Sequence, residues 1–169
     1  MLLILTPKNT GYRNYTYMNN EQAAEILNDL VQINNDRIAG YEHAMIQLEA
    51  GYSNLRGLFA NMINDSKAYT TELSEYISIL KTDVADGTSG AGKIYRTWMD
   101  IKALLTGGDA RSILSTCETI EGAVQKAYDD ALAENGLPEN IFLLLSKQKN
   151  GLIESYGQIK QLLAIASGS

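Results

Sequence analysis

Four long stretches of this chain repeat their apolar residues every three or four positions, which is the spacing of one face of an α-helix. These stretches run from Asn20 to Gly51, Leu55 to Leu80, Asp109 to Ala131 and Pro138 to Leu162. No stretch alternates apolar and polar residues over a useful length, so strands are not expected. The sequence therefore predicts an all-α fold with four long helices.

Single residues indicate where these helices begin and end. Asn20 is suited to cap the first helix, and Gly51 lies where that helix should stop. Gly136 suits the C-terminal cap of the third helix, and Pro138 opens the fourth. The connections within the first pair and within the second pair are short, so each pair is expected to be antiparallel.

A longer segment separates the second helix from the third. It contains a glycine-rich run, DGTSGAG at 86–92, and an expected short helix, KIYRTWMDIKALL at 93–105. This is enough chain to run back along the bundle, as in the ferritin-like topology. Within the short helix, Trp98, Ile101 and Leu105 are expected to pack the crossover onto the bundle.

The glycine pair Gly107 and Gly108 could be a phosphate-binding loop or a turn between helices. A phosphate-binding loop follows a strand and usually carries a lysine, and neither is found at this place. The pair instead follows the last periodic residue of the crossover helix, and Asp109 is positioned to cap the next helix. We therefore interpret the pair as a turn.

Composition excludes several classes of function. The 169 residues carry a net charge of −6 with no cluster of lysine and arginine, so we expect no nucleic-acid partner. The apolar run at residues 2–5 is too short for a membrane span or a signal-peptide core, so no membrane partner is expected. Cys117 is the only cysteine, which excludes an internal disulfide; a small buried hydrophobe in a cytoplasmic protein fits it best.

The first residues differ in character from the rest of the chain. A second methionine, Met18, directly precedes the strong helix start NNEQAAEIL. We expect residues 1–18 to be a disordered tail and residues 19–166 to form one bundle domain.

Three segments carry a resemblance to a known family: LNDLVQINNDRIAGYEHA at 27–44, TWMDIKALLTGGD at 97–109 and CETIEGAVQKAYDDAL at 117–132. They resemble a bacterial domain of unknown function whose members are four-helix proteins classed as ferritin-like. The likeness covers about residues 19–163 and implies a fold, with no assigned reaction. The chain departs from the family where Arg37 replaces an expected glycine and Tyr156 an expected histidine, which weakens any inherited metal site.

Polar residues interrupt the apolar stripes at the middle of the predicted bundle, one on each helix: Asn34, Asp65, Glu121 and Gln148. Further polar residues lie within a turn or two of them: Arg37, Tyr41, Tyr69 and Ser155. One interpretation is a hydrogen-bonded core layer, with Glu121 paired to Arg37, Gln148 or a tyrosine hydroxyl. A second is a divalent metal site of Glu121, Asp65 and Glu118. A third is a small-molecule pocket among the core tyrosines.

The metal interpretation lacks the residues of a ferritin-like di-iron site, which needs Glu-x-x-His on two helices and two more glutamates. The only histidine, His43, is predicted to face solvent, and no Glu-x-x-His occurs. An oxygen-only site would suit a hard cation, and no other cofactor is expected. Without an inward histidine there is no base for a serine or cysteine nucleophile, so no catalytic residue is assigned.

The chain has 10 tyrosines, and four of them are predicted on outer faces: Tyr52, Tyr76, Tyr95 and Tyr156. Tyrosine is enriched at protein interfaces, which suggests a homodimer. The sequence thus favours a ferritin-like four-helix-bundle protein that is non-catalytic and acts by binding or structure. A metal-binding protein with a degenerate carboxylate site, or a helical interaction module working through surface tyrosines, are the alternatives.

Overall fold

A computed structural model describes residues 16–81, 92–102 and 109–168, and every regular element in them is an α-helix. The helices are α1 (Asn20–Gln47), α2 (Ser53–Lys81), α3 (Lys93–Lys102), α4 (Ala110–Leu132) and α5 (Glu139–Ser167). The predicted all-α fold is confirmed for these residues. Residues 1–15, the loop at 86–91, Leu105, the Gly107–Gly108 turn and the side chain of Ile101 lie outside the described part.

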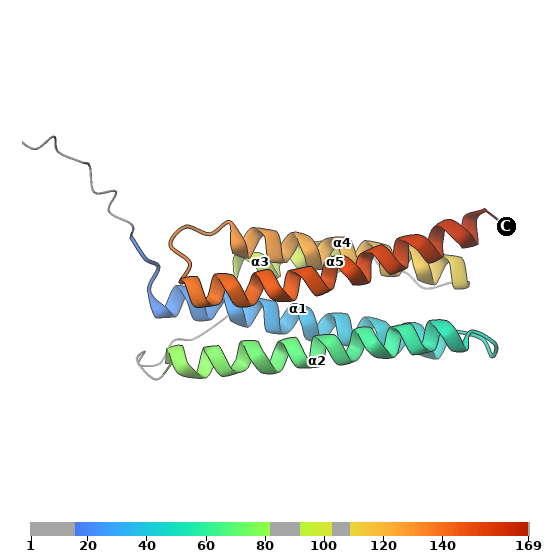
Figure 1. The fold of residues 1–169 in the computed structure, drawn as a ribbon, viewed down its shortest axis with the longest axis horizontal. Coiled ribbons are helices and arrows are strands. Elements are labelled where there is room, and N and C mark those ends of the chain that lie inside the picture. The colour runs from blue at the N-terminus through green and yellow to red at the C-terminus, as the bar shows by residue number, and fades with distance from the viewer. Residues whose placement is uncertain (1–15, 82–91, 103–108, 169) are drawn as a thin grey trace, which may run out of the picture.

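The four long helices form a bundle in which neighbours along the chain are antiparallel, α1 with α2 and α4 with α5 (Figure 1). α1 also contacts α4, and α5 also contacts α2, so each long helix touches two others. α2 and α4 run in the same direction, which requires the chain to return along the bundle between them. α3 belongs to this return path and packs on α1 and α4.

The buried apolar side chains form two separate clusters along the bundle. The larger surrounds the first half of α1 and includes Leu27, Leu30, Val124, Leu145 and Trp98 of α3. The smaller surrounds the second half of α1 and includes Tyr41, Phe59, Met62, Cys117 and Ile159. Burial of each large apolar side chain contributes about 1.5–3 kcal/mol. The break between the clusters is filled by polar side chains.

Two predicted helix caps differ from the structure. The cap of α1 is Asn19 and not Asn20, because Asn19 is extended and its Oδ1 accepts the Gln22 N–H at 2.8 Å, while Gln22 Oε1 accepts the Asn19 N–H at 3.1 Å. This reciprocal capping box needs a Gln or Glu three residues on, which Asn20 lacks. α4 ends at Leu132, before Gly136. Gly136 has φ of +79°, and its carbonyl accepts the Met18 N–H at 3.0 Å.

The predicted inner face of α2 was wrong by a rotation of about one residue. Asp65 is exposed and Leu58 only half-buried, whereas Phe59 and Ser66 are fully buried. α2 packs mainly against α1 and much less against α5, so the side of the helix that faces α1 is the buried one. A periodic stripe gives the width of an apolar face but leaves its centre uncertain when polar residues interrupt it.

Two aspartates of α1 attach α3 to the bundle. The Asp29 carboxylate accepts backbone N–H groups of Gly92 at 2.9 Å and Tyr95 at 3.2 Å, so it caps the start of α3 from a different helix. Asp36 Oδ2 accepts the Trp98 Nε1–H at 2.8 Å and the Tyr95 hydroxyl at 3.0 Å. Trp98 is only 3% exposed, which confirms that it packs the crossover helix onto the bundle.

Candidate functional site

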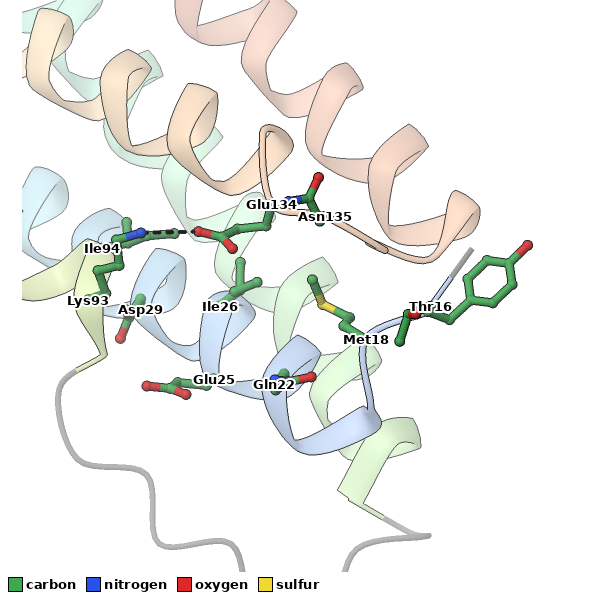
Figure 2. A pocket seen from close by; sticks show the side chains of 11 residues that line it. Thr16, Met18, Gln22, Glu25, Ile26, Asp29, Lys93, Ile94, Glu134 and Asn135 are labelled. Carbon is green, nitrogen blue, oxygen red and sulfur yellow. Dashed lines mark ion pairs between the residues drawn. The ribbon is translucent and has the colours of Figure 1, made fainter. Parts of the chain in front are cut away.

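A surface recess of about 430 Å³ lies where the start of α1, the start of α3 and the α4–α5 connection meet (Figure 2). Three acidic residues line it, Glu25, Asp29 and Glu134. Glu134 lies 3.6 Å from Lys93 Nζ, and both Asp29 oxygens bind the backbone of α3. The described residues that line this recess include no histidine or cysteine, so they offer no nucleophile with a base.

The second gathering of polar residues is the buried layer between the two apolar clusters. Tyr41, which belongs to the smaller cluster, borders it with 0% of its surface exposed, and the half-buried Tyr69 flanks it. Its fully or nearly fully buried members are Asn34, Arg37, Ser66, Glu121, Gln148 and Ser155. Apart from Ser66, each was predicted from the interrupted stripes.

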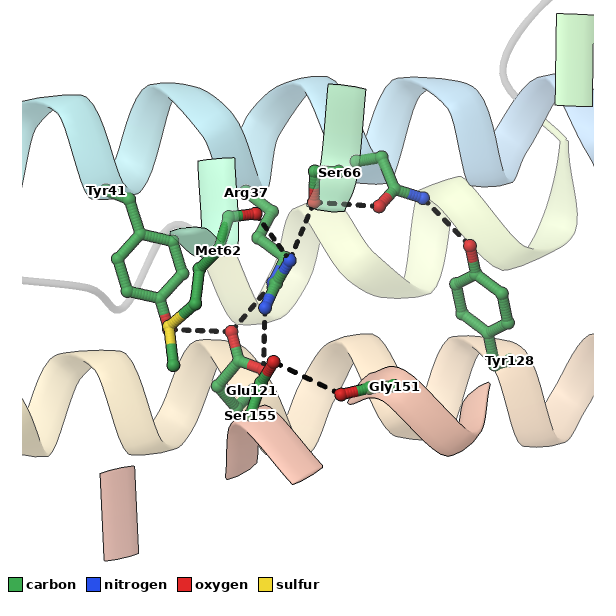
Figure 3. A network of polar contacts seen from close by, with 9 residues as sticks. Arg37, Tyr41, Met62, Ser66, Glu121, Tyr128, Gly151 and Ser155 are labelled. Carbon is green, nitrogen blue, oxygen red and sulfur yellow. Dashed lines mark hydrogen bonds and ion pairs between the residues drawn. The ribbon is translucent and has the colours of Figure 1, made fainter. Parts of the chain in front are cut away.

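Arg37 and Glu121 form an ion pair at the centre of this layer (Figure 3). Arg37 Nε donates to Glu121 Oε1 at 2.7 Å and Nη2 donates to Oε2 at 3.1 Å, which is the two-pronged geometry that suits guanidinium and carboxylate. The Tyr41 hydroxyl donates to Glu121 Oε1 at 2.7 Å. Both charged side chains are 0% exposed, so each charge depends on the other for compensation.

The surroundings keep Arg37 charged and Tyr41 neutral. Burial opposes the charge of Arg37, but the attraction and hydrogen bonds of Glu121 outweigh it, and the Arg37 pKa is raised. Burial, followed by the negative charge of Glu121, raises the pKa of Tyr41 well above its usual value. Tyr41 therefore serves as a fixed hydrogen-bond donor and not as a base.

A chain of hydrogen bonds links this ion pair to the surface. Arg37 Nη1 donates to Ser66 Oγ at 2.8 Å, and Ser66 Oγ donates to Asn34 Oδ1 at 3.0 Å. Asn34 Nδ2 donates to the Tyr128 hydroxyl at 2.9 Å, and that hydroxyl donates to Gln148 Oε1 at 2.8 Å. Every link runs in the same direction, so neighbouring bonds polarise one another.

The chain ends at the surface on the Glu72–Lys147 ion pair. Gln148 Nε2 donates to Glu72 Oε2 at 2.8 Å, and Lys147 Nζ donates to Glu72 Oε1 at 3.1 Å. The hydrogen bond from Gln148, more than that from Lys147, lowers the pKa of Glu72. The series thus starts on a buried cation, ends on a carboxylate and uses all four long helices. It holds the four helices in one mutual register.

The residues proposed for metal binding are not brought together. Among the described residues, no three histidine, cysteine, aspartate or glutamate side chains form a group that could hold a metal ion. Both oxygens of Glu121 bind Arg37, Asp65 is exposed on α2, and Glu118 is half-buried one turn before Glu121. Of the partners that the sequence offered to Glu121, the structure contains Arg37 and a tyrosine hydroxyl, whereas Gln148 binds Tyr128.

Other sequence predictions have mixed outcomes. His43 is exposed, as predicted, and lies 2.9 Å from the side chain of Gln47. Cys117 is 1% exposed, which confirms the buried hydrophobe, and burial raises its pKa to about 12.

The prediction of four surface tyrosines was largely wrong. Of the four, only Tyr52 is exposed, at 41%. Tyr76 and Tyr95 pack against the larger core cluster, and Tyr156 is half-buried beneath Lys160. Their rings are drawn inward because the described helices leave apolar surface between them that a large aromatic side chain can cover.

Sequence reasoning missed the attachment of α3 to α1. Asp29 and Asp36 are seven residues apart, which places them two turns apart on one face of α1. That spacing was the available signal, and it was hidden because surface helices commonly carry acidic residues at such intervals.

The family comparison can now be placed on this geometry. Residues 22–134 match the family model described as a domain of unknown function (DUF2383). The chain belongs to this DUF2383 family. The match spans α1 to α4, so the Arg37–Glu121 pair and the α3 attachment lie inside the DUF2383 region, while α5 with Gln148 lies beyond it. A search of curated proteins finds no match. Among the described helices of this DUF2383 protein, none is long and apolar enough to cross a membrane.

Proposed function

We propose that this chain is a bacterial cytoplasmic protein with a ferritin-like four-helix bundle, and that it acts by binding and not by catalysis. The observation that carries the proposal is the pairing of Arg37 with Glu121. Ferritin-like carboxylate proteins hold their metals at the bundle centre with inward glutamates and histidines. Here a guanidinium takes both oxygens of the one central carboxylate, so the side chains of the protein neutralise that position.

Two further features support the fold and the compartment. The parallel direction of α2 and α4, with α3 on the path between them, is the connection expected of a ferritin-like bundle with one long crossover. The buried thiol of Cys117 suits a reducing compartment.

Elemental analysis tests the non-catalytic proposal against the metal-binding alternative. The untagged protein, purified without chelators, is compared with Glu121→Gln and with Glu118→Gln, a matched change one turn away on α4. We expect no stoichiometric metal in any of the three. Stoichiometric metal that is lost in folded Glu121→Gln and kept in Glu118→Gln would overturn the proposal.

Self-association through tyrosines now depends on Tyr52, the exposed member of the predicted four. Light scattering of the wild type and of Tyr52→Ala over a range of concentrations tests it. A dimer that Tyr52→Ala weakens would support the interaction-module alternative, and a monomer at high concentration would end it.

A further inference from the structure

A polar groove of about 470 Å³ separates α2 from α5, on the side of the bundle where the helices contact each other least. It lies apart from the recess at the start of α3. The residues that define it are Asn64, Asp65 and Tyr69 of α2 and Gly151, Glu154 and Gln158 of α5.

The position of Tyr69 gives this groove a fixed wall. A Cβ at position 151 would overlap the Tyr69 hydroxyl, so Tyr69 can occupy its place only because residue 151 is a glycine. A glycine inside a helix weakens that helix, which the close approach of the ring explains. The Tyr69 hydroxyl makes no hydrogen bond to the described part of the chain. Burial, and then the charge of Asp65, raises the Tyr69 pKa, so the hydroxyl is neutral.

The charge of the groove is negative and uncompensated. Asp65 and Glu154 come from opposite helices, and neither forms an ion pair or hydrogen bond with any described residue. Elsewhere on the surface, by contrast, Glu72 and Asp129 are paired with lysines. No lysine or arginine lines the groove, and the amide oxygen of Gln158 adds a further acceptor.

Carboxylates on two walls, amide oxygens and an aromatic ring without a basic residue suit a ligand that is cationic and rich in N–H donors. We propose that the α2–α5 groove binds a small organic polyamine cation, with ammonium groups at Asp65 and Glu154 and with Tyr69 as the wall between them. This inference rests on the proposed function, since it names a ligand class for a protein that acts by binding. Both carboxylates are exposed, so the binding depends on ionic strength.

Isothermal titration of the full-length protein with spermidine at low salt tests the groove. The informative variant is Asp65→Asn/Glu154→Gln, and the matched control is Glu42→Gln/Glu75→Gln, which makes the same change in net charge at exposed positions outside the groove. We expect one saturable site that the groove variant weakens by about tenfold, since each exposed pair contributes up to about half of that factor on a logarithmic scale. The control should bind within about twofold of wild type.

Absence of saturable binding, or equal weakening by both double variants, would overturn the proposal. Equal displacement of spermidine by Mg²⁺ at matched ionic strength would also overturn it, because the groove would then bind any cation. Failure of this experiment is distinct from failure of the proposed function, which is decided by metal content and by Glu121. A metal-free protein that binds no polyamine refutes the groove alone.

Discussion

The Arg37–Glu121 pair allows a sharp prediction, because both side chains are completely buried and depend on each other. Glu121→Ala leaves the guanidinium without its two carboxylate contacts and leaves the Tyr41 hydroxyl without its acceptor. Removing one partner of a buried pair costs about 3–5 kcal/mol. The orphaned Tyr41 donor is part of that cost. We therefore expect Glu121→Ala to lose about 4 kcal/mol of unfolding free energy.

Replacing both charges should cost much less than removing one. In Arg37→Met/Glu121→Leu no buried charge remains, and apolar side chains of similar volume fill the layer. We expect this double variant to unfold within about 2 kcal/mol of wild type, since apolar replacements of buried pairs are often near neutral. Ser66 keeps its hydrogen bond to Asn34 in that variant, which limits the loss.

Urea unfolding followed by far-ultraviolet circular dichroism and by the fluorescence of Trp98 measures these free energies, provided that both probes give one transition. Glu118→Ala is the matched control and should cost less than about 1 kcal/mol. The reasoning fails if Glu121→Ala costs no more than Glu118→Ala. It also fails if the double variant loses the sum of the two single losses, because the charges would then not be coupled.

Three further predictions concern single residues. Asp29→Ala removes the cap of α3 and should cost about 1–2 kcal/mol and shift Trp98 emission to the red, whereas an unchanged emission spectrum would show that α3 does not depend on Asp29. Cys117, with its pKa raised to about 12, should react with a thiol reagent at pH 8 only when urea unfolds the protein, and rapid reaction in the native state would contradict its burial. Because the pKa of Glu72 is lowered on folding, its contribution is present at neutral pH and is lost as pH falls through the folded-state pKa. Glu72→Gln should therefore unfold with a shallower loss of melting temperature between neutral and acid pH, and an unchanged acid profile would refute this.

Much of the candidate site could be found from the sequence because its members interrupt apolar stripes. Asn34, Glu121 and Gln148 stand at positions where helical spacing demands an apolar residue, so their burial follows from local periodicity. Ser66 could not be found in this way. It is a small polar residue next to Asp65, and only the rotation of α2 against α1 decides which of the two is buried.

The sequence alone determined the all-α class, the long helical spans, and the inner faces of α4 and α5, because each follows from spacing within one helix. Tertiary structure decided what spacing cannot carry. It sets the partner of Glu121, which lies 84 residues away along the chain, and the capping of α3 by an aspartate of α1. It also leaves Asp65 and Glu154 unpaired on either side of one groove. The physical reason is that hydrophobic burial places a residue inside or outside a bundle, whereas ion pairs and hydrogen bonds depend on the relative rotation and register of helices.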